Sequence, residues 1–574
     1  MTHPPEVSVP DWWKSAVVYQ VYPRSFADSD GDGVGDLGGV LAHLDHLEGL
    51  GVDVVWLSPV YRSPMADNGY DISDYHDVDP LFGALEQLDE LVAALHARGM
   101  KLVMDLVVNH TSDAHAWFEE SRSSRENPKR DWYWWRPPRA GFVGGSPGAE
   151  PTNWTSFFSG PAWAFDAATG DYYLHLFAGE QPDLNWENPE VREAVYVMMR
   201  WWLDRGVDGF RMDVINLISK VTSLPDDPDG NASPYVLNGP RIHEFLQEMH
   251  REVFVGRPEG LLNVGETPSC SVEQARLYTD AARGELDMVF QFEHVDLDSG
   301  PRGKWDIVPM TMLDLKDSLG RWQTGLADVG WNSLYLGNHD QPRSVSRFGS
   351  DAPEHREQSA KALATVLHLH RGTPYVYQGD ELGMTNVGFT RIEQLRDVES
   401  LNHYAASVAA GASPEDVMGP LRAKARDNAR TPYPWDDTPS AGFGSGEPWI
   451  ELHPDHATVN AAAQVDDPDS VYTHYRRLIA LRHDEPTVAH GSFRMLLADH
   501  EQVYAFEREH EGTRLLVVAN LSSSADVVPD LAEAPFAGAE LLVCSLPGSS
   551  PAPGDALAPW ESRVFRLGSA AAVR

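Results

Sequence analysis

Eight short apolar runs alternate with amphipathic stretches along most of this chain, and this alternation restricts its fold more than any other feature. Each run has the length of a strand buried on both faces, and stretches such as LEQLDELVAALHARG carry apolar residues at helical spacing before a glycine. Strands joined by helices pair in parallel, so the pattern predicts an α/β fold of eight strand–helix units, a (β/α)8 TIM barrel. The runs lie at 17–26, 52–59, 101–108, 209–216, 262–267, 288–292, 332–340 and 374–381.

A doubly wound open sheet is the alternative arrangement of such units. It would need a glycine-rich phosphate-binding turn after an early strand, and the sequence has none there. The barrel is therefore the preferred architecture.

Two long segments interrupt the alternation. Residues 109–178 are rich in Trp, Pro and Gly and too long for a simple loop, which predicts an inserted subdomain after strand 3. Residues 385–470 form a second irregular insertion, and beyond about 490 short alternating runs predict a C-terminal antiparallel β-sandwich domain. The predicted domains are a barrel of 1–108 and 179–485, a subdomain of 109–178 and a β domain of 486–574.

The charge balance restricts the partners. The chain has 45 Lys and Arg residues against 86 Asp and Glu residues, a formal net charge of −41. Nucleic acids and anionic membranes bind clusters of Lys and Arg, so neither partner is expected. The same charge disfavours a phosphorylated substrate unless a local basic pocket intervenes, and by itself it indicates high solubility.

The cysteine content and the N-terminal sequence bear on the compartment. The only cysteines, Cys270 and Cys544, cannot form a disulfide framework. The first 20 residues show no basic segment followed by an apolar one, and no run has transmembrane length. A cytoplasmic location is therefore expected.

Three acidic residues lie at the polar ends of predicted strands. Asp213, Glu266 and Asp340 end the runs GFRMDVIN, LNVGET and SLYLGNHD. The carboxyl ends of parallel strands meet at one face of a barrel, so these carboxylates are expected to converge. Converging carboxylates can split a glycosidic bond, one as nucleophile and another as proton donor.

The neighbours of two of these acids predict different protonation states. Arg211 lies two residues before Asp213, on the same face of the strand, and its guanidinium is expected to keep Asp213 ionised at neutral pH. Glu266 follows the apolar residues of LNVGE, which predicts a raised pKa and a protonated carboxyl.

Two further strand ends carry groups suited to sugars. The segment ADNGYDISDY combines Asp67 with Tyr70, and DLVVNH places Asn109 and His110 after the third run. Carboxylates bind sugar hydroxyls, and aromatic rings cover apolar sugar faces. An ordinary turn explains the first segment equally well, and a structural role explains the histidine.

The loop DSDGDGVGD has an acidic residue at every second position up to a glycine-tightened turn. Asp28, Asp30, Asp32 and Asp36, with the Val34 carbonyl, predict a site for a hard cation, Ca²⁺ above all and Mg²⁺ as the alternative. Gly39 replaces the glutamate of an EF-hand, so the loop is not one; a structural ion is expected, and an acidic surface loop without an ion is the alternative.

With these residues in place, the chain resembles the α-amylase superfamily, glycoside hydrolase family 13. It is most similar to the α-glucosidase and oligo-1,6-glucosidase branch over roughly residues 10–570. The resemblance rests on the motifs DLVVNH, GFRMDVIN, GET and NHD in this order, with DNGYD, HLFAGEQPDLNWENP, GTPYVYQGDELGMTN and RDNARTPYPWD.

The resemblance implies a role for each acid. Asp213 would be the nucleophile, Glu266 the general acid/base, and Asp340 the group that binds ring hydroxyls and stabilises the distorted transition state. It implies no organic cofactor, and a small oligosaccharide as the substrate. The subsite for the terminal glucose would comprise Asp67, Tyr70, His110, Phe158, Phe177, Gln181, Arg211, His339 and an arginine of RDNARTP, of which Arg426 is preferred.

The residues leave two questions open: whether α-1,6 or α-1,4 bonds are preferred, and whether water or a sugar receives the glucosyl group. Val214 follows the nucleophile, and by resemblance valine there accompanies α-1,6 cleavage, whereas Thr or Ala accompanies α-1,4 cleavage. We expect a retaining exo-α-glucosidase that favours α-1,6 bonds, as a monomer or homodimer. An α-1,4-preferring enzyme, or a transglucosylase or sucrose isomerase with the same intermediate, is the alternative. A non-catalytic relative is disfavoured, because the sequence has all three acids and no membrane span.

Overall fold

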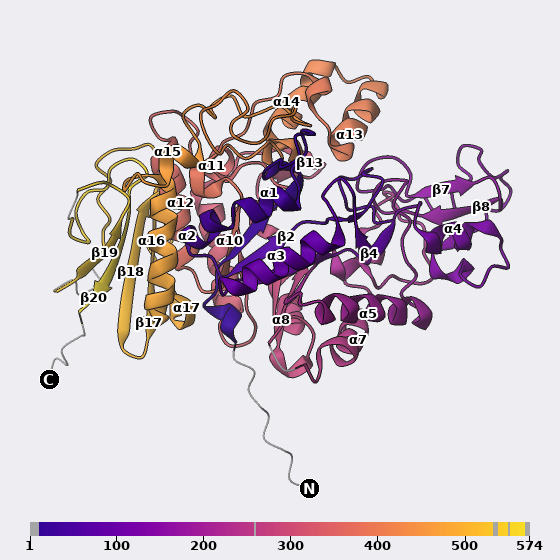
Figure 1. The fold of residues 1–574 in the computed structure, drawn as a ribbon, viewed down its shortest axis with the longest axis horizontal. Helices are drawn as coiled ribbons and strands as arrows, with labels where there is room; N and C mark the ends of the chain where they lie inside the picture. Colours follow the sequence, from indigo (N-terminus) through magenta and orange to yellow (C-terminus); the bar gives the residue numbers. More distant parts are fainter. Residues whose placement is uncertain (1–10, 258–259, 532–537, 549–550, 569–574) are drawn as a thin grey trace, which may run out of the picture.

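The computed structural model describes residues 11–257, 260–531, 538–548 and 551–568. Figure 1 shows the C-terminal antiparallel sheet, in yellow, and the small sheet that contains β7 and β8 at opposite ends of the long axis. The first ten residues of the predicted barrel segment lie outside the described residues.

All eight predicted runs contribute a strand to one parallel sheet, with the order β11-β10-β9-β5-β2-β1-β15-β14. A parallel bridge between Val289 and Asn332 joins the two ends of this sheet, so it closes into the predicted barrel. The strands are β1 (Val18–Val21), β2 (Val54–Leu57), β5 (Lys101–Leu106), β9 (Gly209–Met212), β10 (Leu262–Glu266), β11 (Met288–Phe290), β14 (Ser333–Leu334) and β15 (Thr373–Tyr377).

A helix follows each barrel strand before the next one begins. The stretch LEQLDELVAALHARG forms α3 as expected, because Leu88, Leu91 and Leu95 bury one helical stripe and Gly99 follows with a left-handed φ of 77°. The eight helices are α2 (Leu44–Leu50), α3 (Leu85–Ala97), α5 (Pro189–Asp204), α7 (Ile242–Met249), α8 (Val272–Thr279), α10 (Met312–Gly325), α12 (Arg356–Leu369) and α16 (Val471–Asp484).

Two strands are shorter than their apolar runs. β1 ends at Val21 because Pro23, which has no N–H to donate, begins a 3-10 helix over Pro23–Ser25. In the run 332–340 only Ser333 and Leu334 pair with β15, and the remaining residues, through Asp340, form a loop. The chemically important end of this run is therefore a loop and not a strand.

The first insertion contains a small antiparallel sheet with the order β6-β8-β7. Trp134, Trp154 and Trp163 belong to a buried apolar cluster that also contains Leu217 and Val236 from the segment after β9. Its elements are α4 (Ala116–Ser123), β6 (Trp135–Arg136), β7 (Trp163–Asp166) and β8 (Asp171–Leu174).

The remaining elements lie in the barrel loops and the second insertion. They are α1 (Leu37–Ala42), β3 (Tyr61–Arg62), β4 (Asp74–Val78), α6 (Ser233–Val236), α9 (Glu293–Asp296), β12 (Ser299–Gly300), β13 (Gly303–Ile307), α11 (Ser344–Phe348), α13 (Val398–Ala409), α14 (Pro414–Lys424) and α15 (Ala461–Gln464).

The C-terminal antiparallel β domain is confirmed, and its five named strands form one sheet with the order β16-β17-β18-β20-β19. Helix α12 packs on this sheet, while Val503, Leu516 and Phe565 belong to a separate apolar cluster. The elements are α17 (Pro486–His490), β16 (Ser492–Leu496), β17 (Val503–His510), β18 (Thr513–Asn520), β19 (Glu540–Cys544) and β20 (Ser562–Leu567). The exact domain boundaries stay a prediction.

Within the part of the chain that the structure describes, no helix combines the length and the apolar character needed to cross a bilayer.

Candidate active site

The three strand-end acids line one cavity of about 280 Å³. Asp213 directly follows β9, Glu266 is the last residue of β10, and Asp340 lies in the loop after β14. Because these strands are parallel, their carboxyl ends open at the same end of the barrel. The expected convergence is therefore present.

Arg211 connects two of these acids through a single guanidinium. Its Nη1 donates to Asp213 Oδ1 at 2.6 Å, and its Nη2 lies 2.5 Å from Glu266 Oε1. The side chain of Arg211 is buried, so both contacts are shielded from solvent. Asp213 and Glu266 are thus held next to each other by one fixed positive charge.

The two acids differ in pKa, although less than expected from the sequence. Burial raises the pKa of Glu266 to about 8 against the opposing charge of Arg211, which confirms the expected raised value. Burial also raises the pKa of Asp213 to about 7, and Arg211 lowers it only in part. Arg211 was expected to keep Asp213 ionised at neutral pH, and this is met only in part, because desolvation opposes the ion pair and leaves the pKa close to neutral. Asp213 still loses its proton before Glu266.

Asp340 has a different electrostatic environment. Its Oδ1 accepts from Arg426 Nη1 at 3.1 Å and from Arg430 Nη2 at 2.7 Å, and its Oδ2 lies 3.1 Å from His339 Nε2. Burial would raise its pKa, but His339 and the two arginines outweigh burial and hold it well below its ordinary value. Asp340 is therefore the acid of this site that stays ionised at neutral pH.

A second polar group lies beside this one. Asp67 Oδ1 accepts from Arg426 Nη2 at 2.9 Å, and its Oδ2 accepts from Gln181 Nε2 at 3.1 Å. Gln181 Nε2 also lies 3.2 Å from His110 Nε2. Burial raises the pKa of Asp67 to about 7 despite Arg426, and burial lowers that of His110 to about 4, so this imidazole is neutral.

Aromatic rings complete the cavity. Tyr70 stacks on His339 with ring centroids 5.1 Å apart and an interplanar angle of 4°. Phe158 and Phe177 also line the cavity, and the guanidinium carbon of Arg426 lies 4.9 Å from the Phe158 ring centroid. Of the twelve predicted catalytic and subsite residues, nine line the cavity, and Gln181, Arg211 and His339 lie directly behind them.

The structure adds Asp105 and Asp397, which the sequence did not reveal, and it gives a contact to Arg430, the other arginine of RDNARTP. Asp105, within β5, accepts from Arg211 Nη1 at 2.6 Å and from Trp56 Nε1 at 2.8 Å. Arg430 contacts Asp340, and Asp397 contacts both Arg430 and Arg426. A carboxylate inside the apolar run KLVMDLVV was the available signal for Asp105, because such a group needs a buried partner.

Val214 has an unusual backbone conformation at the edge of the site. Its φ of 35° and ψ of 42° lie in the left-handed region, which a β-branched residue rarely adopts. In this conformation its N–H donates to Glu266 Oε2 at 3.0 Å, and its side chain lines the cavity. The strained residue therefore contributes to fixing the Glu266 carboxyl.

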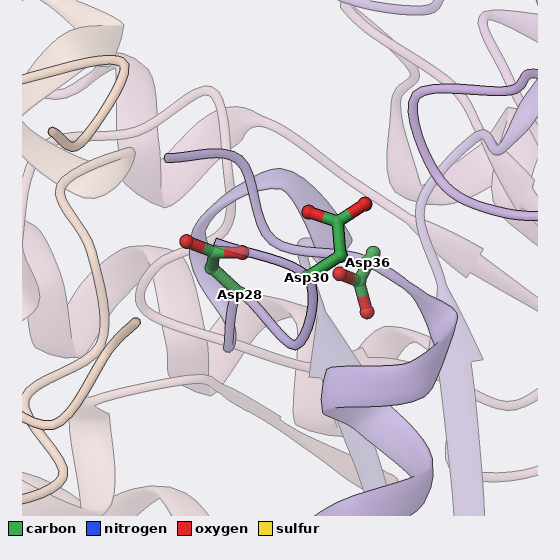
Figure 2. A group of neighbouring side chains, drawn as sticks. All are labelled: Asp28, Asp30 and Asp36. Carbon is green, nitrogen blue, oxygen red and sulfur yellow. The ribbon is translucent and has the colours of Figure 1, made fainter. Parts of the chain in front are cut away.

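Figure 2 shows Asp28, Asp30 and Asp36 grouped on the loop before helix α1, and each offers a carboxylate oxygen within 4.8 Å of the others. Three of the four predicted acidic ligands thus lie together. Asp32 is not in this group, and its Oδ1 accepts from the Val34 N–H at 2.8 Å. Asp36 also caps α1 by accepting from Gly39 N at 2.7 Å.

Comparisons with known proteins agree with this geometry. Residues 20–491 match the alpha amylase catalytic domain family, and residues 493–552 match the maltogenic amylase C-terminal domain. An oligo-1,6-glucosidase of Halalkalibacterium halodurans is 55% identical over 89% of this chain and 90% of its own length. An oligo-1,6-glucosidase of Parageobacillus thermoglucosidasius is 53% identical over 97% of this chain and 99% of its own length.

The crystal structure of a Bacillus licheniformis trehalose-6-phosphate hydrolase has a TM-score of 0.91 and 44% identity, covering 97% of this chain and 100% of that one. The catalytic-domain match, the identities and the coverage show that the chain belongs to the α-amylase superfamily, glycoside hydrolase family 13, in the α-glucosidase and oligo-1,6-glucosidase branch.

Proposed function

We propose that this glycoside hydrolase is a retaining exo-α-glucosidase that removes terminal glucose from short oligosaccharides and favours α-1,6 bonds. One observation carries the proposal: Asp213 and Glu266 contact the same guanidinium of Arg211 at the cavity wall, with the higher pKa on Glu266. A nucleophile that ionises first and an acid that keeps its proton form the pair that retaining cleavage needs.

In the first step, Asp213 attacks the anomeric carbon as the bond to the leaving oxygen breaks. Glu266 transfers its proton to that oxygen, which leaves a covalent β-glucosyl-enzyme and a free sugar. In the second step, Glu266 removes a proton from water, the water oxygen attacks the anomeric carbon, and Asp213 leaves. The product is α-glucose. Retaining geometry predicts about 5–5.5 Å between the two carboxyl groups.

The other site residues are proposed to bind the terminal glucose. Asp340 is held ionised by its arginines and can accept hydrogen bonds from ring hydroxyls. The Asp67–Arg426 contact joins residues 359 positions apart across the cavity, which supports a pocket for a chain end. Tyr70 and Phe158 supply apolar surface for a sugar ring.

A phosphorylated substrate is the alternative suggested by the trehalose-6-phosphate hydrolase relative. Its phosphate would need a cation that is not already neutralised. Among the cavity residues that the structure describes, Lys304 pairs with Glu399 at 2.7 Å, and Lys424 lies 2.8 Å from Asp298. Arg347 also contacts Asp298, and the nearby Asp296 interacts electrostatically with both Arg347 and Lys424. Arg426 contacts three aspartates. These pairings favour an uncharged leaving sugar.

A substrate panel tests the proposed function. Isomaltose, maltose, sucrose, trehalose and trehalose 6-phosphate are incubated separately with the protein, and the products are separated by chromatography. We expect glucose to be released fastest from isomaltose and slowest from the phosphorylated sugar. Failure to release glucose from any α-glucoside would refute hydrolysis, and rearranged sucrose would identify an isomerase.

Replacing Val214 with threonine should reduce the preference for α-1,6 bonds. Valine and threonine are both β-branched, so the backbone strain at φ 35° is unchanged and a methyl group is exchanged for a hydroxyl next to the substrate. We expect the isomaltose-to-maltose ratio of kcat/KM to fall by about tenfold. Val221→Thr, outside the cavity wall, is the matched control. An unchanged ratio in Val214→Thr would exclude this residue as a linkage determinant.

We also propose that Asp28, Asp30 and Asp36 hold one structural Ca²⁺, or Mg²⁺ in its place. The three carboxylates fit such an ion, because hard cations take oxygen ligands and these oxygens lie within 4.8 Å of one another. When bound, the ion would supply charge neutralisation at this loop and would take no part in bond cleavage.

Chelation tests this site without a measure of activity. With Ca²⁺ at about 100 times its Kd, removal of the ion should lower the melting temperature by roughly 5 °C. Asp30→Asn should abolish this response. Asp32→Asn is the matched control, since Asp32 is also exposed but lies outside the group of three. An unchanged melting curve with no metal detected by elemental analysis would refute the ion site.

We retain the predicted domain boundaries at about 109, 179 and 486 as part of this proposal, together with a cytoplasmic location and a monomeric or homodimeric state. The separate antiparallel sheet β6-β8-β7 supports the inserted subdomain, and the separate apolar cluster of the C-terminal sheet supports the last boundary. The two cysteines form no disulfide with each other, which fits a reducing compartment.

A further inference from the structure

An exposed phenylalanine lies in the wall of the active-site cavity. Phe157 is 40% exposed to solvent, whereas the adjacent Phe158 is 7% exposed. Among the exposed large apolar side chains of the described residues, Phe157 is the one that lines this cavity. Solvent-exposed apolar surface in the wall of a binding cavity often marks a place where a ligand binds.

Phe157 is the outermost ring of an aromatic series that begins at the buried end of the site. The ring of His110, 2% exposed, lies 5.1 Å from that of Phe177 between centroids. The Phe177 ring, in turn, lies 5.5 Å from that of Phe157. Exposure therefore increases along the series from the predicted glucose subsite outwards.

The local backbone fixes the Phe157 ring in this position. Its N–H donates to Leu176 O at 2.8 Å, which ties it to the strand-end segment that carries Phe177. The turn then reverses at Ser159 and Gly160, with left-handed φ values of 73° and 82°. Ser156 Oγ accepts from the Phe158 N–H at 3.0 Å. Hydrogen bonds thus fix the backbone at Phe157, and contact with the Phe177 ring supports its side chain on one side.

We propose that Phe157 is the stacking platform for the sugar on the leaving-group side of the scissile bond. This inference rests on the proposed glucosidase function. Glucose in the inner subsite contacts the His110 and Phe158 part of the wall, so the next sugar outwards meets the exposed ring of Phe157. An aromatic face covers the apolar face of a pyranose, and a ring that is already held in place binds it with little loss of conformational freedom. The ligand is a neutral hexose, either as leaving group or as glucosyl acceptor.

The test compares two donors that share the glucosyl group and differ in the leaving group. Isomaltose leaves a sugar ring, and α-glucosyl fluoride leaves an ion that cannot stack. For Phe157→Ala we expect the isomaltose-to-fluoride ratio of kcat/KM to fall about three- to tenfold, mainly through a higher KM for isomaltose. Transfer of glucose to added isomaltose should fall in parallel, and Phe157→Trp should restore both.

Phe142→Ala is the matched control, because Phe142 is 48% exposed on the same insertion but does not line the cavity. The isomaltose-to-fluoride ratio of kcat/KM in Phe142→Ala should equal that of the unmodified protein. An unchanged ratio in Phe157→Ala would overturn the platform while leaving the glucosidase function intact. If the unmodified protein cleaves neither donor, the proposed function itself fails, so the two failures are distinguishable.

Discussion

Asp213→Asn is expected to lower kcat/KM for isomaltose by about 10⁴-fold or more, with the fold retained. The amide has nearly the shape of the carboxylate but cannot attack the anomeric carbon, so the glucosyl-enzyme does not form. Steady-state kinetics measure the loss, and thermal unfolding by circular dichroism checks the fold. Substantial activity in this variant would contradict the assignment of Asp213 as nucleophile.

Asp287→Asn provides a matched control for the loss of a buried carboxylate. Burial raises the pKa of Asp287 to about 7, as it does for Asp213, but Asp287 precedes β11 at the other end of the barrel and accepts from Asn263 N at 2.7 Å. Its activity should stay within about threefold of the unmodified protein. A further test separates chemistry from structure: azide added to Asp213→Ala should yield β-glucosyl azide from an α-glucosyl donor.

Glu266→Gln is expected to reduce kcat/KM for isomaltose by about 10³-fold, because the leaving oxygen receives no proton. α-Glucosyl fluoride needs no such proton, so glucosylation of Asp213 should continue with this donor. The second step lacks its base, and the covalent intermediate should accumulate. Mass spectrometry would detect one added glucosyl group per chain. Absence of the adduct, together with equal losses on both donors, would contradict the acid/base role. Glu285→Gln, a buried acid outside the cavity, is the control.

The pKa values of Asp213 and Glu266 predict how activity depends on pH. Below about pH 7 Asp213 is protonated and cannot attack, and above about pH 8 Glu266 has lost the proton that it must donate. The profile of kcat/KM for isomaltose should therefore be bell-shaped with a maximum between these values, and the two limbs belong to the coupled pair. Because α-glucosyl fluoride needs no proton from Glu266, the kcat/KM profile of the unmodified protein with this donor should lack the alkaline limb. Its persistence would assign that limb to another group.

The eight strands were predictable because each is a continuous apolar run, and burial on both faces leaves no other place for such a run. The ends of the runs were less predictable. Pro23 stops β1 early, and the NHD segment leaves β14 after two residues, since backbone pairing there depends on the neighbouring strand β15. Pairing partners are set by tertiary contacts that a single run does not encode.

The sequence by itself determined the acids and their order along the chain. Asp213, Glu266 and Asp340 lie at the ends of the fourth, fifth and seventh apolar runs, and Arg211 shares a strand face with Asp213 because side chains alternate along a strand. These relations are local in sequence. The alternation of side chains along a strand is sufficient to derive the relation between Arg211 and Asp213.

Only the tertiary structure decided what surrounds those acids. Arg426 reaches Asp67 across 359 positions of sequence, and Asp105 joins Arg211 from a neighbouring strand. The pKa of Asp213 is near 7 because the whole barrel buries this carboxyl. The effect of burial outweighs the effect of the adjacent Arg211. Desolvation and long-range ion pairs depend on every segment that surrounds a group. Local sequence therefore determined where the reactive residues lie along the chain, and the folded barrel determined their protonation.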